Sequence, residues 1–349
     1  VVDSEADPAR SLVDQIVAAH PQTPSTVQIL RNPQSACSLK CSSLIQVISG
    51  LDRRYGVVAL LDTDVVPHPR WLRDMVAPLK DPQVGAATGN RWFAPSPPSW
   101  PNLCRYAWNA AAVVWMYRLG IAWGGSMALK RCVIDEGHAL SDWSRAYGED
   151  TAINPSLRRL GLRLEFVPSG IITERSSCDS SQLLNWVTRQ LLSCRLHHAG
   201  WKLVLFHGMA SSAALGSAAL IFFAALALRY GELAVLTGAV LAAFFLIPFA
   251  LLLILESSVR GASGDRNRAS GRMRHPVSAF KLMLAVVLTQ ILYTYVLVRA
   301  ATMRSVAWRG ARYEIVGRGR IRLVEYSPWT RSALSLIPRA PGASLRRSS

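Results

Sequence analysis

Two long stretches without a charged residue constrain this chain most strongly. Residues 209–228 hold no charge over 20 positions, and residues 233–255 hold none over 23. A helix needs about 20 apolar residues to cross the hydrocarbon core of a bilayer. A charged side chain at the centre of such a helix costs about 2.5–3.5 kcal/mol, so its absence over both lengths predicts two membrane-spanning helices.

A third charge-free stretch, residues 282–298, is shorter, with 17 residues, and contains Gln290 and two tyrosines. We expect it within a membrane-embedded piece over residues 279–300, either as a tilted span or as a re-entrant segment. The three apolar pieces together predict a membrane domain over residues 208–303.

The overall composition supports a membrane protein rather than a nucleic-acid binder. The chain has 349 residues and a formal net charge of +17, yet half of its residues are hydrophobic. A nucleic-acid binder would gather its basic residues in one patch or stripe, whereas here arginines are spread through the first half and then surround the apolar segments. Nucleic acid is therefore not an expected partner. The six cysteines have no zinc-ligand spacing and are expected to be ordinary thiols.

Basic residues beside the apolar segments predict the orientation. The linker 256–281 contains Arg260, Arg266, Arg268, Arg272, Arg274 and Lys281. Loops rich in Lys and Arg stay on the cytoplasmic side, so the linker and the soluble region before the first span are both expected in the cytoplasm. The tail 304–349 is also basic, and a third full span would place it outside. We therefore favour a re-entrant third segment.

The first 178 residues alternate short apolar runs with helical patterns, which is typical of a layered α/β domain. Strands are predicted at residues 27–30, 57–61, 84–89 and 163–167, and helices at 69–79 and 150–160. Residues 179–207 mix apolar and basic side chains with tryptophans and predict an amphipathic helix at the membrane interface. A helix packed on the soluble domain is the alternative.

The start of the chain shows no signal-peptide pattern, because Asp3, Glu5 and Asp7 leave no apolar core before Arg10. The first three residues look like the last part of a strand. We expect the fold to begin upstream of Val1, so that the first strand of the domain is missing.

Asp62-Thr63-Asp64 directly follows the apolar run 57–61. Two carboxylates at the end of a strand can turn toward one ligand. Hard oxygen donors suit Mn²⁺ or Mg²⁺, and these ions keep positions open for phosphate oxygens. The motif therefore indicates a metal that holds a nucleotide diphosphate, although Asp-x-Asp also occurs in solvated turns.

Three further motifs are each ambiguous alone. Glu149-Asp150 opens a predicted helix, where acidic residues are most often caps. The Gly124-Gly125 pair is a turn signal, and small residues also let the backbone approach a ligand closely. Lys40 is either a diphosphate contact or an exposed lysine at a helix start.

In this order the motifs resemble those of a family 2-type glycosyltransferase with the GT-A fold, and most closely the ceramide glucosyltransferase branch, family 21. The resemblance covers about residues 1–205 and recurs near residue 308, where Trp308-Arg309-Gly310-Ala311-Arg312-Tyr313 is similar to the cytoplasmic tail motif of that branch. It implies an α/β nucleotide-diphospho-sugar transferase domain followed by α-helical membrane segments.

The resemblance also implies roles for single residues on the donor side. Asp3 and Asp7 would lie beside the nucleotide base. Lys40 would contact the diphosphate, although Ser43 replaces the Asn of the family's Lys-x-x-Asn-Leu stretch. Asp62 would contact the donor and, with Asp64, would hold the metal.

On the acceptor side, Asp150 would be the catalytic base that deprotonates the acceptor hydroxyl, a role typically worth about 10²–10⁴-fold in rate. The remaining acceptor-side positions implied by the resemblance are Trp123, Gly124, Gly125 and Glu149.

One departure from the family pattern concerns the leaving diphosphate. Arg189 and Gln190 begin the stretch that matches (Gln or Arg)-x-x-Arg-Trp, but Leu192 and Ser193 stand in place of Arg and Trp. Arg195 could supply part of the missing charge. The departure argues against a polysaccharide synthase, because that Trp lines the acceptor channel in such enzymes.

Taken together, the resemblance implies inverting transfer of a hexose from a nucleotide sugar, with UDP-glucose expected as donor and Mn²⁺ or Mg²⁺ as cofactor, to a lipid acceptor in the membrane. Transfer to a polyprenyl phosphate or a polysaccharide is an alternative, because one fold serves all three. A non-catalytic membrane scaffold is another. The Ala- and Arg-rich composition indicates a bacterial inner membrane, with Golgi or ER for a eukaryotic source. The oligomeric state stays open.

Overall fold

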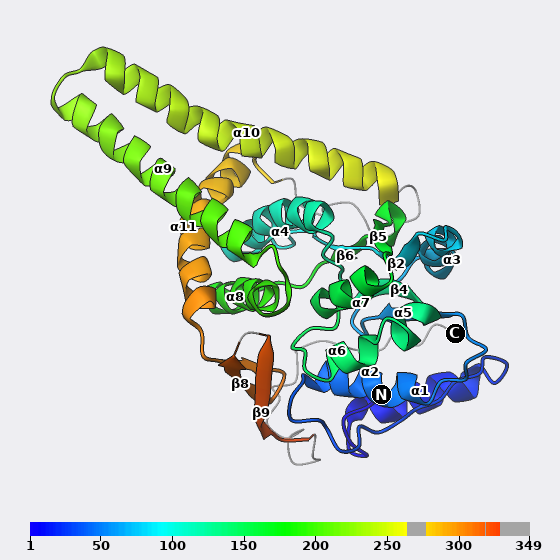
Figure 1. Cartoon of the computed structure of the whole chain (residues 1–349). Helices are drawn as coiled ribbons and strands as arrows, with labels where there is room; N and C mark the ends of the chain where they lie inside the picture. The colour runs from blue at the N-terminus through cyan, green and yellow to red at the C-terminus, as the bar shows by residue number, and fades with distance from the viewer. Residues whose placement is uncertain (264–276, 318, 329–349) are drawn as a thin grey trace.

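The computed structural model describes residues 1–263, 277–317 and 319–328 (Figure 1). An α/β domain is followed by three long apolar helices and a small antiparallel sheet. Part of the basic linker and tail on which the orientation prediction rests lies outside the described residues, namely Arg266, Arg268, Arg272, Arg274, Arg318 and the tail beyond residue 328.

A four-stranded sheet in the order β1-β4-β2-β5 forms the centre of the domain. Its strands are β1 (Val57–Leu61), β2 (Val84–Thr88), β4 (Ser126–Lys130) and β5 (Arg163–Phe166). β4 runs antiparallel to β1 and β2, whereas β2 and β5 are parallel. The carboxyl ends of β1, β2 and β5 therefore meet the amino end of β4 at one edge, which is where ligands bind in open α/β sheets.

The strand predicted at residues 27–30 does not join the central sheet. Within it only Ile29 pairs, in a single parallel bridge with Val2. The extended segment around Val2 is short, because the chain turns into helix α1 (Pro8–Ala19) only a few residues later. Asp7 caps this helix by accepting a hydrogen bond from the amide of Ala9 at 2.9 Å.

Helices cover both faces of the sheet. On one face, Val58 and Leu60 of β1 pack with an apolar cluster from four helices. On the other face, Trp71 and Met75 pack against β2 and β4. The helices of the first face are α2 (Leu39–Ser49), α5 (Arg131–Asp135), α6 (Ala139–Trp143) and α7 (Asn154–Arg159), and that of the second is α3 (Trp71–Val76), which continues into the 3-10 helix η1 (Ala77–Lys80).

A second apolar cluster lies beside the domain and joins it to the membrane helices. It is built on the two-stranded parallel sheet of β3 (Arg91–Phe93) and β6 (Ile172–Glu174). The helices around it are α4 (Trp100–Leu119), α8 (Ser180–His197), α10 (Gly231–Ser263) and α11 (Ala279–Thr302).

The amphipathic segment predicted at 179–207 is divided in two. Helix α8 begins with a capping box between Asp179 and Gln182 and ends at His197. The ring of His198 contacts the carbonyl of Leu119 and the amide of Gly200, which separates α8 from α9 (Trp201–Ala227). Seven α8 side chains are buried, so this helix packs on the domain over much of its length.

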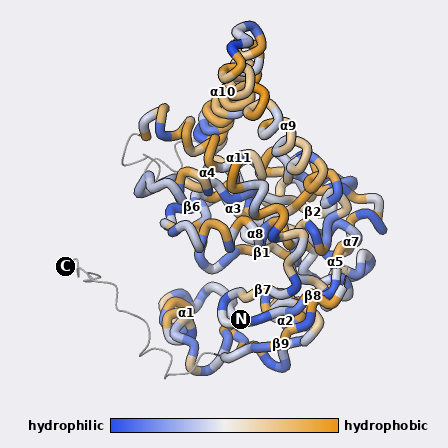
Figure 2. The backbone as a smooth tube through the Cα atoms, turned by 90° about the vertical axis from the view of Figure 1, so that its left-hand side faces the viewer, coloured by the Kyte–Doolittle hydropathy of each residue, from blue (hydrophilic) through white to orange (hydrophobic). Residues whose placement is uncertain are grey.

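Helices α9 and α10 form a long pair that projects beyond the domain, and apolar residues dominate it (Figures 1 and 2). Near its end, α10 returns to the domain, where Glu256 accepts hydrogen bonds from Trp92 Nε1 at 2.9 Å and Tyr106 Oη at 2.7 Å. Within the described residues, α9, α10 and α11 are each long and apolar enough to cross a membrane.

The third apolar segment is longer than its charge-free stretch, because α11 extends past Lys281 and Arg299 to 24 residues. The re-entrant turn favoured from the sequence is absent from residues 279–302, which form one continuous helix. α11 lies against α4 and α8, with Thr289 Oγ1 3.4 Å from the carbonyl of Cys104.

The basic tail returns to the domain as an antiparallel sheet of β7 (Ser305–Trp308), β8 (Ala311–Gly317) and β9 (Arg320–Tyr326). Tyr313 is buried there with Tyr147 and with Leu192, which stands where the family pattern has Arg. The hydroxyl of Tyr313 accepts a hydrogen bond from the amide of Leu39 at 3.1 Å. Two residues 274 positions apart in sequence are thus brought together on one side of the domain.

Candidate active site

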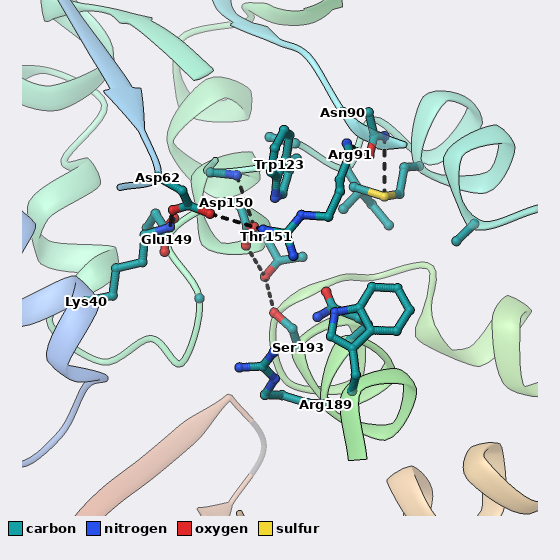
Figure 3. Close-up of a pocket in the computed structure, with 18 of the residues that line it drawn as sticks. Lys40, Asp62, Asn90, Arg91, Trp123, Glu149, Asp150, Thr151, Arg189 and Ser193 are labelled. Atoms are coloured by element: carbon teal, nitrogen blue, oxygen red, sulfur yellow. Dashed lines mark hydrogen bonds and ion pairs between the residues drawn. The ribbon is translucent and has the colours of Figure 1, made fainter. Parts of the chain in front are cut away.

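The edge where β1, β2 and β5 end carries the predicted functional residues (Figure 3). Asp62 follows β1, Arg91 lies beyond β2, and Gly124-Gly125 precedes β4. The amide of Asp62 donates to the carbonyl of Gly125 at 3.2 Å. The antiparallel direction of β4 is therefore what brings the glycine pair beside the Asp-x-Asp motif.

Close approach of neighbouring side chains requires glycine at both positions. A Cβ atom added to Gly124 would lie 1.8 Å from Glu149 Oε1, and one added to Gly125 would lie 2.2 Å from the Trp123 ring and 2.7 Å from Asp62 Oδ2. Neither position leaves room for a side chain, so the backbone of the two glycines packs directly against the carboxyl groups of Glu149 and Asp62.

Lys40 joins two of the predicted acids. Its Nζ lies 2.7 Å from Asp62 Oδ1 and 2.6 Å from Glu149 Oε1. Desolvation lowers the pKa of Lys40, but the nearby carboxylates more than offset this and hold that pKa raised. Burial raises the pKa of Glu149, and Lys40 opposes that rise. Lys40 thus holds Asp62 and Glu149 in place and keeps a positive charge beside both of them.

Asp150 is held by backbone amides on both of its oxygens. Oδ1 accepts from the amide of Thr151 at 2.7 Å, and Oδ2 accepts from the amide of Gly124 at 3.2 Å. A carboxylate has about four acceptor positions, so an acceptor hydroxyl can still be bound. The Thr151 hydroxyl lies 2.7 Å from that of Ser193, so the residue that replaces the family Trp steadies the loop of Asp150.

Asp62 and Asp64 have different cationic partners. Asp62 is paired with Lys40 and lies 3.5 Å from Arg91, whereas Asp64 is 3.2 Å from Arg309 and about half exposed. Among the described residues, no group of three or more His, Cys, Asp or Glu side chains is placed to hold a metal. The two carboxylates fit a hard cation that takes most of its ligands from phosphate oxygens and water.

Arg189 and Gln190 both line the cavity at this site. The guanidinium of Arg189 lies over the Trp308 ring at 4.7 Å, and no carboxylate in the described part of the chain pairs with it. Burial lowers the pKa of Arg189, Tyr147 opposes this, and the positive charges of Arg309 and Arg91 lower it further. These arginines therefore leave positive charge around the cavity that an anion can neutralise.

The structure corrects the role expected for Arg195. Its guanidinium donates to the carbonyls of Ala300 at 2.8 Å and Met303 at 2.9 Å, at the end of α11, and it does not line the cavity. Residues six apart on a helix lie about 120° apart around its axis, so Arg195 faces away from the side that carries Arg189.

Asp3 and Asp7 line another part of the same cavity. Asp7 accepts a hydrogen bond from the amide of Asp3 at 3.0 Å and caps α1, which gives it a structural role of its own. The Tyr326 hydroxyl of β9 hydrogen-bonds to Asp3. The nucleotide-base role of the two acids stays a prediction.

Arg91 and Tyr147 line the cavity but were not predicted as site residues. Arg91 lies over the Trp123 ring at 5.1 Å and near Asp62. Its place just after a predicted strand was the available signal. Tyr147 packs against Trp308 with ring centroids 5.9 Å apart, a contact that depends on the return of the tail and left no local signal.

One cavity of about 1580 Å³ connects these residues with the membrane helices. At its polar side lie Asp62, Asp64 and Asp150, and at its apolar side lie side chains of α4, α10 and α11. The apolar lining includes Ala111, Leu251, Leu252, Val286 and Tyr293. A ligand with a polar head and an apolar chain fits this distribution.

The chain matches a known protein family over most of its length. A family model described as Glycosyl transferase family 21 matches residues 1–321, which covers the α/β domain, the apolar helices and most of the C-terminal sheet. No curated protein matches the chain.

Proposed function

Because the chain belongs to glycosyl transferase family 21 and is a glycosyltransferase, we propose that it moves a hexose from a nucleotide sugar to a lipid acceptor that stays in the membrane. UDP-glucose is the donor we propose first. The chain is an integral membrane protein, and we propose that its catalytic domain lies in the cytoplasm.

The continuity of the cavity carries this proposal. The acids and arginines at the sheet edge suit a nucleotide diphosphate, because guanidinium groups bind phosphate oxygens through several charge-assisted hydrogen bonds. The apolar lining from α4, α10 and α11 suits acyl chains, whose burial is favourable in proportion to area. A water-soluble acceptor would not need such a lining.

The position of the acids supports the following roles in the proposed reaction. Asp150 takes the proton of the acceptor hydroxyl, and that oxygen displaces the nucleoside diphosphate from the anomeric carbon with inversion. Lys40, Arg91 and Arg189 supply positive charge on the side of the leaving group. Bound at Asp62 and Asp64, Mn²⁺ or Mg²⁺ would supply further positive charge to the leaving diphosphate.

The same arrangement supports the proposed orientation. α9 starts and α10 ends at the domain, so the hairpin returns to the side it left, and the C-terminal sheet packs on that same domain. α11 packs along α4 and α8 of the domain, so we propose that it stays on the domain's side of the bilayer and does not cross it. The positive linker and tail, which lie before and after α11, would then both be in the cytoplasm.

Filling the apolar side of the cavity tests the acceptor class. Ala111 is exposed to the cavity, so Ala111→Trp adds a large ring there without displacing a core side chain. Ala243 is also exposed on an apolar helix but does not line the cavity, so Ala243→Trp is the matched control. Ala111→Trp should raise the KM for a lipid acceptor about tenfold or more and leave nucleotide affinity unchanged. Equal acceptor KM values in the two variants would contradict the lipid proposal.

A further inference from the structure

The turn between β7 and β8 carries an arginine in an unfavourable backbone conformation. Trp308 and Ala311 pair as the ends of a two-residue turn, in which Arg309 has φ 47° and Gly310 has φ 77°. Such turns favour Asn, Asp or Gly at both central positions. A non-glycine residue with positive φ is uncommon and often marks a functional position.

The turn reaches the donor side of the cavity from outside the α/β domain. Trp308, Arg309 and Gly310 all line the cavity. The Arg309 guanidinium contacts Asp64 at 3.2 Å, and the Trp308 ring lies under the guanidinium of Arg189 at 4.7 Å. The turn therefore contacts both an acid of the Asp-x-Asp motif and the first residue of the altered arginine-tryptophan stretch.

The sheet that presents this turn is fixed to the domain. The amide of Leu323 donates to the carbonyl of Ser35 at 2.7 Å, and Tyr313 is buried against Tyr147. Leu192 and Leu196 of α8 complete the contact. Leu192 thus supports the sheet at the position where the family pattern has its arginine.

The geometry assigns to Arg309, with Trp308 positioning Arg189 beside it, the diphosphate contact that Leu192 cannot make. Arg309 exchanges Asp64 for the diphosphate of the donor when a divalent cation takes Asp64, and Trp308 holds the Arg189 guanidinium beside it. This assignment rests on the proposed function, because it needs a nucleoside diphosphate at this site.

The charges support an exchange of this kind. The pair of Arg309 and Asp64 is largely exposed, with side chains 70% and 48% accessible, and exposed pairs contribute little to stability. Arg189 has no carboxylate partner among the described residues, and Arg309 and Arg91 are close enough to disfavour its charged form. A diphosphate would neutralise these charges at once.

Binding measurements on the full-length protein in detergent test the assignment. Arg309→Gln removes the charge, and Arg312→Gln is the matched control, since Arg312 lies on β8 directly after the turn, pairs with Glu325 at 3.7 Å and does not line the cavity. The measurements are calorimetric titration with UDP, GDP and ADP in the presence of Mn²⁺, and Mn²⁺ binding alone by electron paramagnetic resonance.

Arg309→Gln should weaken nucleoside diphosphate binding about tenfold or more, as expected for a lost charge-assisted hydrogen bond. It should leave Mn²⁺ binding equal or tighter, because Arg309 no longer competes for Asp64. Arg312→Gln should change neither quantity by more than about twofold. A merely structural role of Arg309 would not weaken diphosphate binding while leaving Mn²⁺ binding equal or tighter.

Other results would overturn the assignment. Equal diphosphate binding by Arg309→Gln and wild type would leave the proposed function standing and remove Arg309 from the site. A parallel loss of Mn²⁺ and diphosphate binding with a lower melting temperature would show that the turn only supports the fold. No binding of any of the three diphosphates by wild type would instead refute the proposed function itself.

Discussion

Substitution of Gly124 by alanine is the sharpest structural test of the acid cluster. The new methyl group would lie 1.8 Å from Glu149 Oε1, so one of the two must move by on the order of 1.5 Å to reach ordinary contact. Glu149 is buried and holds Lys40, whereas the amide of Gly124 holds Asp150. Either movement therefore disturbs the catalytic arrangement.

The two possible movements predict different magnitudes. If Glu149 moves, its buried pair with Lys40 is broken, which costs about 3 kcal/mol, the lower end of the usual range because Lys40 keeps partial exposure. If the backbone of Gly124 moves, Asp150 shifts by about 1 Å, and misplacement of this size costs about 10²-fold in rate. Gly124→Ala should therefore lower the melting temperature, kcat or both, according to which of the two groups moves.

Gly56→Ala is the matched control, because nothing lies within 4 Å of a Cβ atom at that glycine. Its stability should change by less than about 1 kcal/mol. Release of nucleoside diphosphate in the presence of lipid acceptor gives kcat, and thermal unfolding in detergent gives stability. Gly124→Ala behaving like Gly56→Ala in both assays would refute the close packing of the acids.

Three further variants test separate parts of the account. Burial lowers the pKa of His197 from 6.5 to about 4, so the contribution of His197 to stability is complete above pH 6.5 and is lost as pH falls toward 4. His197→Gln should remove up to about 3 kcal/mol of this pH dependence. The melting temperature measured across that pH window tests this. Arg195→Ala should cost about 1–2 kcal/mol of stability through its lost hydrogen bonds to the end of α11 while leaving the Kd for UDP nearly unchanged, and a selective rise of that Kd would return Arg195 to the donor site. Asp64→Ala should lower the Mn²⁺-dependent part of UDP affinity at least about tenfold, and identical titrations with and without Mn²⁺ would remove Asp64 from the metal site.

Local patterns predicted the parts of the fold that depend on neighbours in sequence. The apolar run before Asp62 became β1, and the charge-free stretches became α9 and α10. The strands at 84–89 and 163–167 and the helix at 69–79 were confirmed within a residue or two at most ends, with the last turn of that helix as 3-10 helix η1. In each case burial of a periodic apolar face decides the structure, and that periodicity is visible in the sequence.

Features that depend on distant contacts were not predictable in the same way. The break after His197 depends on the carbonyl of Leu119, and the direction of Arg195 depends on where α11 ends. The return of Trp308 to Tyr147 joins residues separated by nearly half of the chain. Such contacts leave no local periodicity, so the amphipathic segment was predicted as one helix and Arg195 as a site residue.

Transfer of label from nucleotide sugar to lipid tests the central claim most directly. Purified full-length protein is incubated with radiolabelled UDP-glucose, and with other nucleotide sugars in turn, together with extracted membrane lipids and Mn²⁺. The account predicts label in the organic phase with wild type, at least about 10²-fold less with Asp150→Asn, and equal UDP binding by both proteins. The account would be contradicted if wild type put no label into the organic phase, or if wild type and Asp150→Asn put equal amounts there.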